Sequence, residues 1–239
     1  MAFEKLADHV VICELDPEVV AVWRVATSRD CEILVERILR FEVSESNVRA
    51  VLARESGEDG DIAFRTIIKN RMFHGGILAP GSSLMKSGEN GKGLSSRWYA
   101  KTLAMRLGAI ADIRDRITVI EGDGISLMTS HKEDSSTATF IDPPYTAAGK
   151  KAGSRLYRYN ELNHGALFSA AKAMSGDFLM TYDNADGVRS LANEHGFDTE
   201  EISMKNTHHA KMTELLIGRD LSWARVRDKE AKQLSLGFD

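Results

Sequence analysis

The sequence predicts an α/β protein with a doubly wound, mostly parallel sheet, a C-terminal antiparallel hairpin and a mainly helical insertion. Short apolar runs at 9–13, 117–120, 138–141 and 178–181 have the length of strands, and an acidic residue lies just after each of them. Helix-like spacing separates the runs, and strands that alternate with helices are typical of a parallel sheet. Two further strand-like runs, at 200–204 and 213–217, follow one another directly and predict the hairpin.

The first strand has a well-marked end. Glu14-Leu15-Asp16-Pro17 follows the β-branched run at 9–13, and apolar residues at helical spacing continue from there. Proline suits the first position of a helix behind an Asp cap, so we expect a strand, an acidic turn and a helix in that order. Apolar spacing predicts further helices at 31–41, 164–174 and 187–195.

The regular alternation lapses in the middle of the chain, between Glu42 and Gly108. Helix-compatible stretches there are interrupted by repeated glycines. We therefore predict a main domain formed by 1–41 and 109–226, interrupted by an insertion at 42–108. A flexible surface tail is expected at 227–239.

Composition predicts an ordinary soluble globular chain. Its 239 residues carry a formal net charge of −4, so any contact with nucleic acid must be local. The two cysteines, Cys13 and Cys31, form neither a disulfide framework nor a zinc pattern, which predicts a reducing, cytoplasmic location. No apolar run has the length of a membrane span, and the first residues do not resemble an export signal.

The most informative segment is Asp142-Pro143-Pro144-Tyr145, which follows the strand-like run at 138–141. Two consecutive prolines remove two backbone donors and fix φ, so the segment must leave the strand as a rigid loop. Ligands of open α/β sheets bind at the carboxyl ends of strands, where this acid and this ring are expected. A strand-terminating turn with a surface Asp and a packed Tyr explains the same residues equally well.

Two basic stretches provide candidate contacts to phosphates. The first consists of cations with two aromatic residues among them: Lys86, Lys92, Arg97, Trp98, Tyr99, Lys101 and Arg106. Cations can follow a phosphate backbone while rings stack on bases, although an amphipathic helix with a solvated basic face has the same pattern. The second stretch either clamps phosphates or forms a solvated loop, and consists of Lys150, Lys151, Arg155 and Arg158.

At its strand ends the sequence resembles the D12 class of DNA N6-adenine methyltransferases. Asp142-Pro143-Pro144-Tyr145 is similar to the family's target-base motif. Glu14 matches the strand-end acid that binds the ribose of S-adenosylmethionine. Asp123, in Glu121-Gly122-Asp123, matches the acid that faces the adenine of this cofactor.

The resemblance extends over nearly the whole chain. Asn70-Arg71, followed by Gly75-Gly76, resembles a segment near the start of the family's DNA-recognition insertion, and 206–217 resembles its late hairpin. Asn70 and Arg71 therefore join the two basic stretches as expected DNA contacts. Adjacent His208 and His209 would point to opposite faces of a strand, so we do not expect them to form a metal site.

The resemblance implies a Rossmann-like class I methyltransferase that flips an adenine out of double-stranded DNA and methylates its N6 atom without a metal. Asp142 and the carbonyl of Pro143 would accept the two amino hydrogens, Pro144 would stiffen the turn, and Tyr145 would stack on the base. Asp142 is also expected beside the cofactor. The catalytic domain would be 1–41 and 109–226, and 42–108 would recognise the DNA target.

One part of the family pattern is not found in these residues. Members have a first strand and a Phe-x-Gly-x-Gly turn that cradles the methionine part of the cofactor, and a chain without this βα unit would expose two strand edges. Three explanations follow: the true start lies upstream of these residues, a partner polypeptide supplies the unit to this subunit, or the chain is a catalytically defective DNA-binding remnant. An RNA base methyltransferase, which shares the tetrapeptide, is a lesser alternative.

Overall fold

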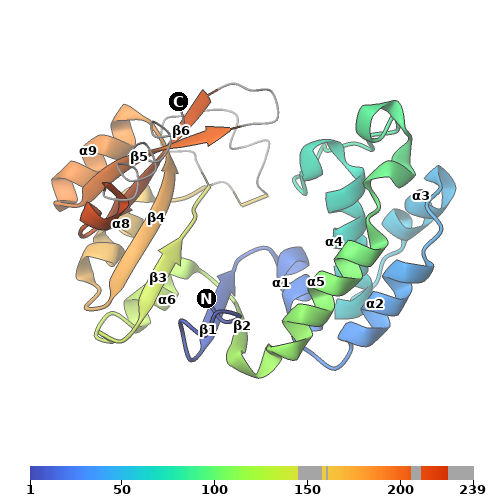
Figure 1. The fold of residues 1–239 in the computed structure, drawn as a ribbon, viewed down its shortest axis with the longest axis horizontal. Helices are drawn as coiled ribbons and strands as arrows, with labels where there is room; N and C mark the ends of the chain where they lie inside the picture. The colour runs from blue at the N-terminus through green and yellow to red at the C-terminus, as the bar shows by residue number, and fades with distance from the viewer. Residues whose placement is uncertain (145–157, 160, 206–210, 226–239) are drawn as a thin grey trace, which may run out of the picture. The chain divides into compact units, whose positions relative to one another are not determined.

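The computed structural model describes residues 1–144, 158–159, 161–205 and 211–225 (Figure 1). The chain divides into two compact units. The first unit contains Met1–Gly124 together with Arg155–Tyr159, and the second contains Ile125–Ser154 and Asn160–Asp239. Each unit has a hydrophobic core of its own.

The first unit combines a pair of strands with a group of helices. The strands are β1 (Val10–Glu14) and β2 (Ile117–Glu121). The α-helices are α1 (Pro17–Ala26), α2 (Cys31–Arg40), α3 (Glu45–Ala53), α4 (Asp59–Met72) and α5 (Ala100–Asp112). Short 3-10 helices connect them: η1 (His74–Gly76), η2 (Glu89–Gly91), η3 (Leu94–Arg97) and η4 (Arg114–Arg116).

The junction of β1 and α1 forms as the sequence predicts. Asp16 caps α1, because its side chain accepts a hydrogen bond from the Glu18 amide at 2.9 Å, and Pro17 occupies the start of the helix. β1 runs parallel to β2, with Glu14 opposite Glu121 at the end of the pair. The carboxyl ends of both strands therefore lie at one edge.

The helices of the first unit bury one apolar core. α1 packs on α4 and α2 packs on α5 (Figure 1). The completely or almost completely buried side chains include Ile38, Val48, Phe64, Ile68 and Met72. Trp98 packs against this core, with its ring 5.5 Å from Phe41 and its indole N–H donating to the carbonyl of Ile38 at 3.2 Å. Trp98 therefore has a structural partner on both its apolar and its polar side.

The second unit contains a sheet and the helices that pack on it. The helices are α6 (Gly124–Ser130), α8 (His164–Ala173) and α9 (Asp186–His195). The strands are β3 (Ala138–Ile141), β4 (Asp177–Asp183), β5 (Asp198–Lys205) and β6 (Lys211–Gly218). Their order in the sheet is β3-β4-β6-β5, with β3 parallel to β4 and the other neighbours antiparallel.

One face of this sheet carries the core of the second unit. Met180 and Tyr182 of β4, and Leu215 and Ile217 of β6, are buried. They share a cluster with apolar residues of α6, α8 and α9, including the completely buried ring of Phe168. Because successive residues of a strand point to opposite faces, the residues between them belong to the other face, which includes Thr181.

The α/β class, the predicted helices and the closing hairpin are confirmed. The described strands form a two-stranded parallel sheet and a four-stranded mixed sheet, and not one continuous sheet. The parallel pairs are β1–β2 and β3–β4, and the antiparallel pairings all involve β5 or β6 of the predicted hairpin. In the described part of the chain, no helix has the length and apolar character of a membrane span.

Candidate functional site

The end of β1 forms a compact acidic turn in the first unit. Oε1 of Glu14 accepts hydrogen bonds from the backbone amides of Leu15, at 2.8 Å, and Asp16, at 2.9 Å. The Glu14 carboxylate is therefore folded over its own turn and held there by two donors, with its side chain half-buried.

The predicted cofactor acids Glu14 and Asp123 lie at the ends of adjacent parallel strands. The amide of Gly122 donates to the carbonyl of Glu14 at 3.0 Å, which extends the pairing to the residue before Asp123. Burial raises the pKa of the nearby Cys13 thiol, and the negative charges of Asp123 and Glu14 raise it further. Two carboxylates at one strand edge can accept hydrogen bonds from the hydroxyl and amino groups of a bound nucleoside.

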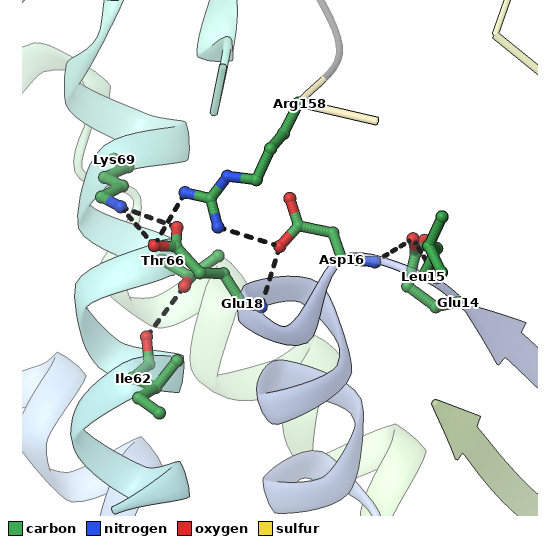
Figure 2. A network of polar contacts seen from close by, with 8 residues as sticks. All are labelled: Glu14, Leu15, Asp16, Glu18, Ile62, Thr66, Lys69 and Arg158. Carbon is green, nitrogen blue, oxygen red and sulfur yellow. Dashed lines mark hydrogen bonds and ion pairs between the residues drawn. The ribbon is translucent and has the colours of Figure 1, made fainter. Parts of the chain in front are cut away.

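A network of ion pairs lies directly beside this turn (Figure 2). Nζ of Lys69, from α4, is 2.7 Å from both carboxylate oxygens of Glu18, at the start of α1. The guanidinium of Arg158 lies 3.0 Å from Glu18 and 3.5 Å from Asp16. The network thus joins three parts of the chain that are far apart in the sequence.

The charges of this network stabilise one another. Burial alone raises the pKa of Glu18, but hydrogen bonds from Lys69 and Arg158, together with their positive charges, outweigh it, so the pKa lies below its ordinary value. Burial lowers the pKa of Arg158, and the hydrogen bond to Glu18 and the charges of Asp16 and Glu18 outweigh that effect and raise it. Glu18 is therefore a carboxylate, and Arg158 a cation, at neutral pH.

Asp142 lies in the second unit, immediately after β3. Its side chain is exposed, whereas Pro143 is buried and Pro144 half-buried. The hydroxyl of Thr181, on β4, donates to Oδ1 of Asp142 at 2.7 Å. Ile141 lies opposite Met180 in the parallel pair, so Asp142 and Thr181 occupy the next position in the same register. The fourth residue of the motif, Tyr145, lies outside the described residues.

Three of the predicted DNA contacts hold the turns between α4 and α5. Asn70 donates to the carbonyl of Gly76 at 3.2 Å, and Nε of Arg71 donates to the carbonyl of Arg97 at 2.9 Å. Arg97 in turn donates to the carbonyl of Phe73 at 2.8 Å. These bonds give Asn70, Arg71 and Arg97 a structural role, whatever else they bind.

Arg71 also has an electrostatic role in these turns. Its guanidinium lies 5.1 Å from the centre of the Tyr99 ring, and the Tyr99 hydroxyl donates to Glu89. Burial lowers the pKa of Arg71, and the positive charge of Arg97 lowers it further. The negative charge of Glu89 acts in the opposite direction and raises this pKa.

The remaining basic residues differ in what they contact. Lys86 forms an ion pair with Glu45 at 3.0 Å. Lys92 and Lys101 are exposed, and neither forms an ion pair with a described residue. Arg158 belongs to the network beside the acidic turn. The other predicted contacts of the second basic stretch, Lys150, Lys151 and Arg155, lie outside the described residues, as do His208 and His209.

Lys69 and Thr181 contact predicted site residues or their neighbours, yet the sequence did not single them out. Lys69 directly precedes Asn70-Arg71, but on its own it is an ordinary helix lysine. Thr181 is the last residue of the strand-like run before Tyr182 and Asp183, and a strand-end hydroxyl is a weak signal. In both cases the partner lies far away in the sequence.

Among the residues that the structure describes, no three His, Cys, Asp or Glu side chains lie together as a metal site. Comparison with protein-family models and with curated proteins gives no match for this chain.

Proposed function

We propose that the chain transfers a methyl group from S-adenosylmethionine to N6 of an adenine in double-stranded DNA. The observation that carries the proposal is the position of Asp142, an exposed carboxylate directly after β3, followed by a buried proline and oriented by the Thr181 hydroxyl. Transfer of a labelled methyl group from S-adenosylmethionine to duplex DNA tests the proposal, and its complete absence at high protein concentration contradicts it.

In the proposed reaction, the protein increases the nucleophilicity of the amino nitrogen of adenine. The lone pair of the adenine amino nitrogen is delocalised into the ring, and two acceptors for its hydrogens favour a pyramidal nitrogen. Asp142 supplies one acceptor and the carbonyl of Pro143 the other, on backbone that two prolines keep rigid. The bond from sulfur to the methyl carbon breaks as the carbon–nitrogen bond forms, and one amino proton leaves through Asp142 to solvent.

S-adenosylmethionine supplies the electrophilic methyl group in this proposal. Glu14 would accept hydrogen bonds from its ribose hydroxyls and Asp123 from its adenine amino group, and both acids stand at the carboxyl ends of β1 and β2. Oε1 of Glu14 already accepts two amides, which leaves the other carboxylate oxygen for a ligand. This geometry within the first unit supports the cofactor proposal.

The exposed cations Lys92 and Lys101 support the DNA part of the proposal. A cation that neutralises a phosphate releases a counterion, so its contribution appears in the salt dependence of binding. Target adenines would be flipped out of the duplex before methylation.

The double variant Lys92→Ala/Lys101→Ala is expected to weaken binding to all duplex sequences alike. The plot of log affinity against log salt should become shallower by about 1.8, which is about 0.9 for each lost phosphate contact. Fluorescence anisotropy with a labelled duplex at several salt concentrations measures both quantities. Lys132→Ala, which removes an exposed lysine of the second unit, is the control. If the slope of log affinity against log salt is unchanged in the double variant, Lys92 and Lys101 do not contact DNA phosphates.

Thr181→Val is expected to lower the rate constant of methyl transfer about tenfold, because it removes a hydrogen bond to a charged acceptor. Thr181→Ser retains the hydroxyl and should remain close to wild type. Single-turnover kinetics with saturating cofactor and DNA separate this step from binding. Equal losses in the valine and serine variants would show that Thr181 acts through packing and not through Asp142.

A second candidate function is a subunit that needs a partner to bind the cofactor. It is favoured by the strand edges: among the described strands β1 pairs only with β2, and β3 only with β4. Val11 of β1 is 48% exposed and Phe140 of β3 is 65% exposed, whereas strands of parallel sheets are normally covered on both faces. A partner's strand and glycine-rich turn would pair with such an edge.

Titration calorimetry with S-adenosylmethionine decides between the two candidates. The 239-residue chain is compared with a version that carries an added strand, glycine-rich turn and helix ahead of Met1. Binding by the chain alone supports the active enzyme and contradicts the need for a partner. Binding by the extended version alone shows that the added unit is needed, whether it is part of the same polypeptide or comes from a partner, and contradicts cofactor binding by these residues alone.

A further inference from the structure

The acidic turn after β1 carries more negative charge than its surroundings can accept without compensation. Glu14, Asp16 and Glu18 lie within five residues of one another in the sequence. Asp16 and Glu18 are each only 8% exposed, and burial of an unpaired carboxylate is strongly unfavourable. The turn can therefore keep this geometry only if cations lie against it.

Two cations from distant parts of the sequence provide the compensation. Lys69 contacts both oxygens of Glu18 at 2.7 Å, and Arg158 bridges Glu18 and Asp16 (Figure 2). Two positive charges against three negative ones leave one negative charge in the turn. It remains on Glu14, which forms no ion pair with a described residue.

Asp16 connects this network mechanically to Glu14. Its amide donates to Oε1 of Glu14, while its own Oδ1 accepts from the Glu18 amide and lies near Arg158. A shift of Asp16 would therefore move the donor that holds the Glu14 carboxylate. The side chains of Lys69 and Arg158 are only 17% and 28% exposed, so bulk water does not replace them easily.

We propose that Lys69 and Arg158 are positioning residues that hold the Glu14 turn and leave Glu14 as its single uncompensated carboxylate, ready to accept the hydroxyls of a ribose. The ribose part of this inference rests on the proposed function, whereas the positioning of the turn does not. Neither cation needs to touch the ligand.

The first arm of the test needs no ligand. In Arg158→Gln, hydrogen exchange at the amides of Asp16 and Glu18 should become about tenfold faster, because a charge-assisted contact that closes the turn is lost. Arg37→Gln is the matched control: it removes an ion pair to Asp61 of α4, at 2.6 Å, from an arginine that is 32% exposed, close to the 28% of Arg158, and that lies away from the acidic turn. Arg158→Lys retains the charge and should restore most of the protection, and Lys69→Met is a second variant if Arg158→Gln does not fold.

The second arm measures the ligand preference. The wild-type chain should bind adenosine more tightly than 2′,3′-dideoxyadenosine, which lacks the 2′ and 3′ hydroxyls of the ribose, and Arg158→Gln should reduce this ratio of affinities about tenfold. Arg37→Gln should leave the ratio unchanged. A general loss of structure would weaken both nucleosides alike and would not change the ratio.

The outcomes separate the inference from the proposed function. Unchanged exchange in Arg158→Gln, or faster exchange with an unchanged adenosine preference, overturns the positioning of Glu14. Faster exchange at Asp16 and Glu18 but not in the Arg37→Gln control supports it. If the turn loosens in this way but the wild-type chain binds no adenosine nucleoside or S-adenosylmethionine, the positioning of the turn stands and the proposed cofactor is contradicted.

Discussion

Replacement of Asp142 by alanine is expected to lower the rate of methyl transfer by about 10²-fold or more, with little change in affinity for duplex DNA. The substitution removes the acceptor for one amino hydrogen at the moment when positive charge develops on the nitrogen. The Asp142 side chain is exposed, so its removal leaves no buried cavity, and we expect the fold to be retained. The loss should therefore appear in the transfer step.

Single-turnover transfer and DNA anisotropy, measured side by side, provide the test. Asp177→Ala is the control, because Asp177 is an exposed acid at the opposite end of the same β3–β4 pair. An RNA of the same sequence is added as a competing substrate, so that preference for RNA is detected directly. If Asp142→Ala loses DNA affinity and thermal stability to the same degree as transfer, Asp142 is a structural turn residue.

The elements that the sequence predicted well are those encoded by neighbouring residues. Asp16 and Pro17 form a cap and a helix start through atoms two residues apart, and the β-branched runs form strands of the expected length. The late hairpin likewise depends on two runs that follow each other. The acids expected at strand ends lie at strand ends, because a strand end is itself a local feature.

The contacts that the sequence did not predict connect distant residues. Lys69 and Glu18 are 51 residues apart, and Thr181 and Asp142 are 39 apart. Trp98 has cations as neighbours in the sequence, but its indole N–H donates to the carbonyl of Ile38, which is 60 residues away. Such pairs depend on how helices and strands pack, and the composition of a single segment does not predict them. Strand pairing has the same origin, which explains why the division into two sheets was not foreseen.

Glu18→Gln is expected to lower the free energy of unfolding of the first unit by about 3 kcal/mol at neutral pH. Glutamine retains the size of the side chain but not its charge, so Lys69 and Arg158 would remain beside a neutral amide in a largely buried place. The side chain of Glu18 is only 11% exposed, and solvent can compensate little. Lys69→Met in the same chain should recover part of the loss, because it removes one uncompensated cation.

The pH dependence gives this prediction a sign. The pKa of Glu18 in the folded chain lies below its ordinary value of 4.5, so its stabilising effect is fully present above that pH and is lost as the pH falls through the folded pKa. The difference between wild type and Glu18→Gln should be constant near neutral pH and shrink in acid. Urea titrations in a Trp223→Phe background follow Trp23 and Trp98, which both belong to the first unit.

Glu36→Gln is the control for the effect of burial on the stability that an ion pair contributes. It breaks the ion pair between Glu36 and Arg40, whose side chains are 58% and 79% exposed, and an exposed pair within one helix contributes little to stability. A loss in Glu18→Gln no larger than that in Glu36→Gln would mean that the network does not stabilise the first unit. A large loss that persists unchanged in acid would assign the effect to packing, since a neutral carboxyl and an amide differ little once the charge of Glu18 has gone.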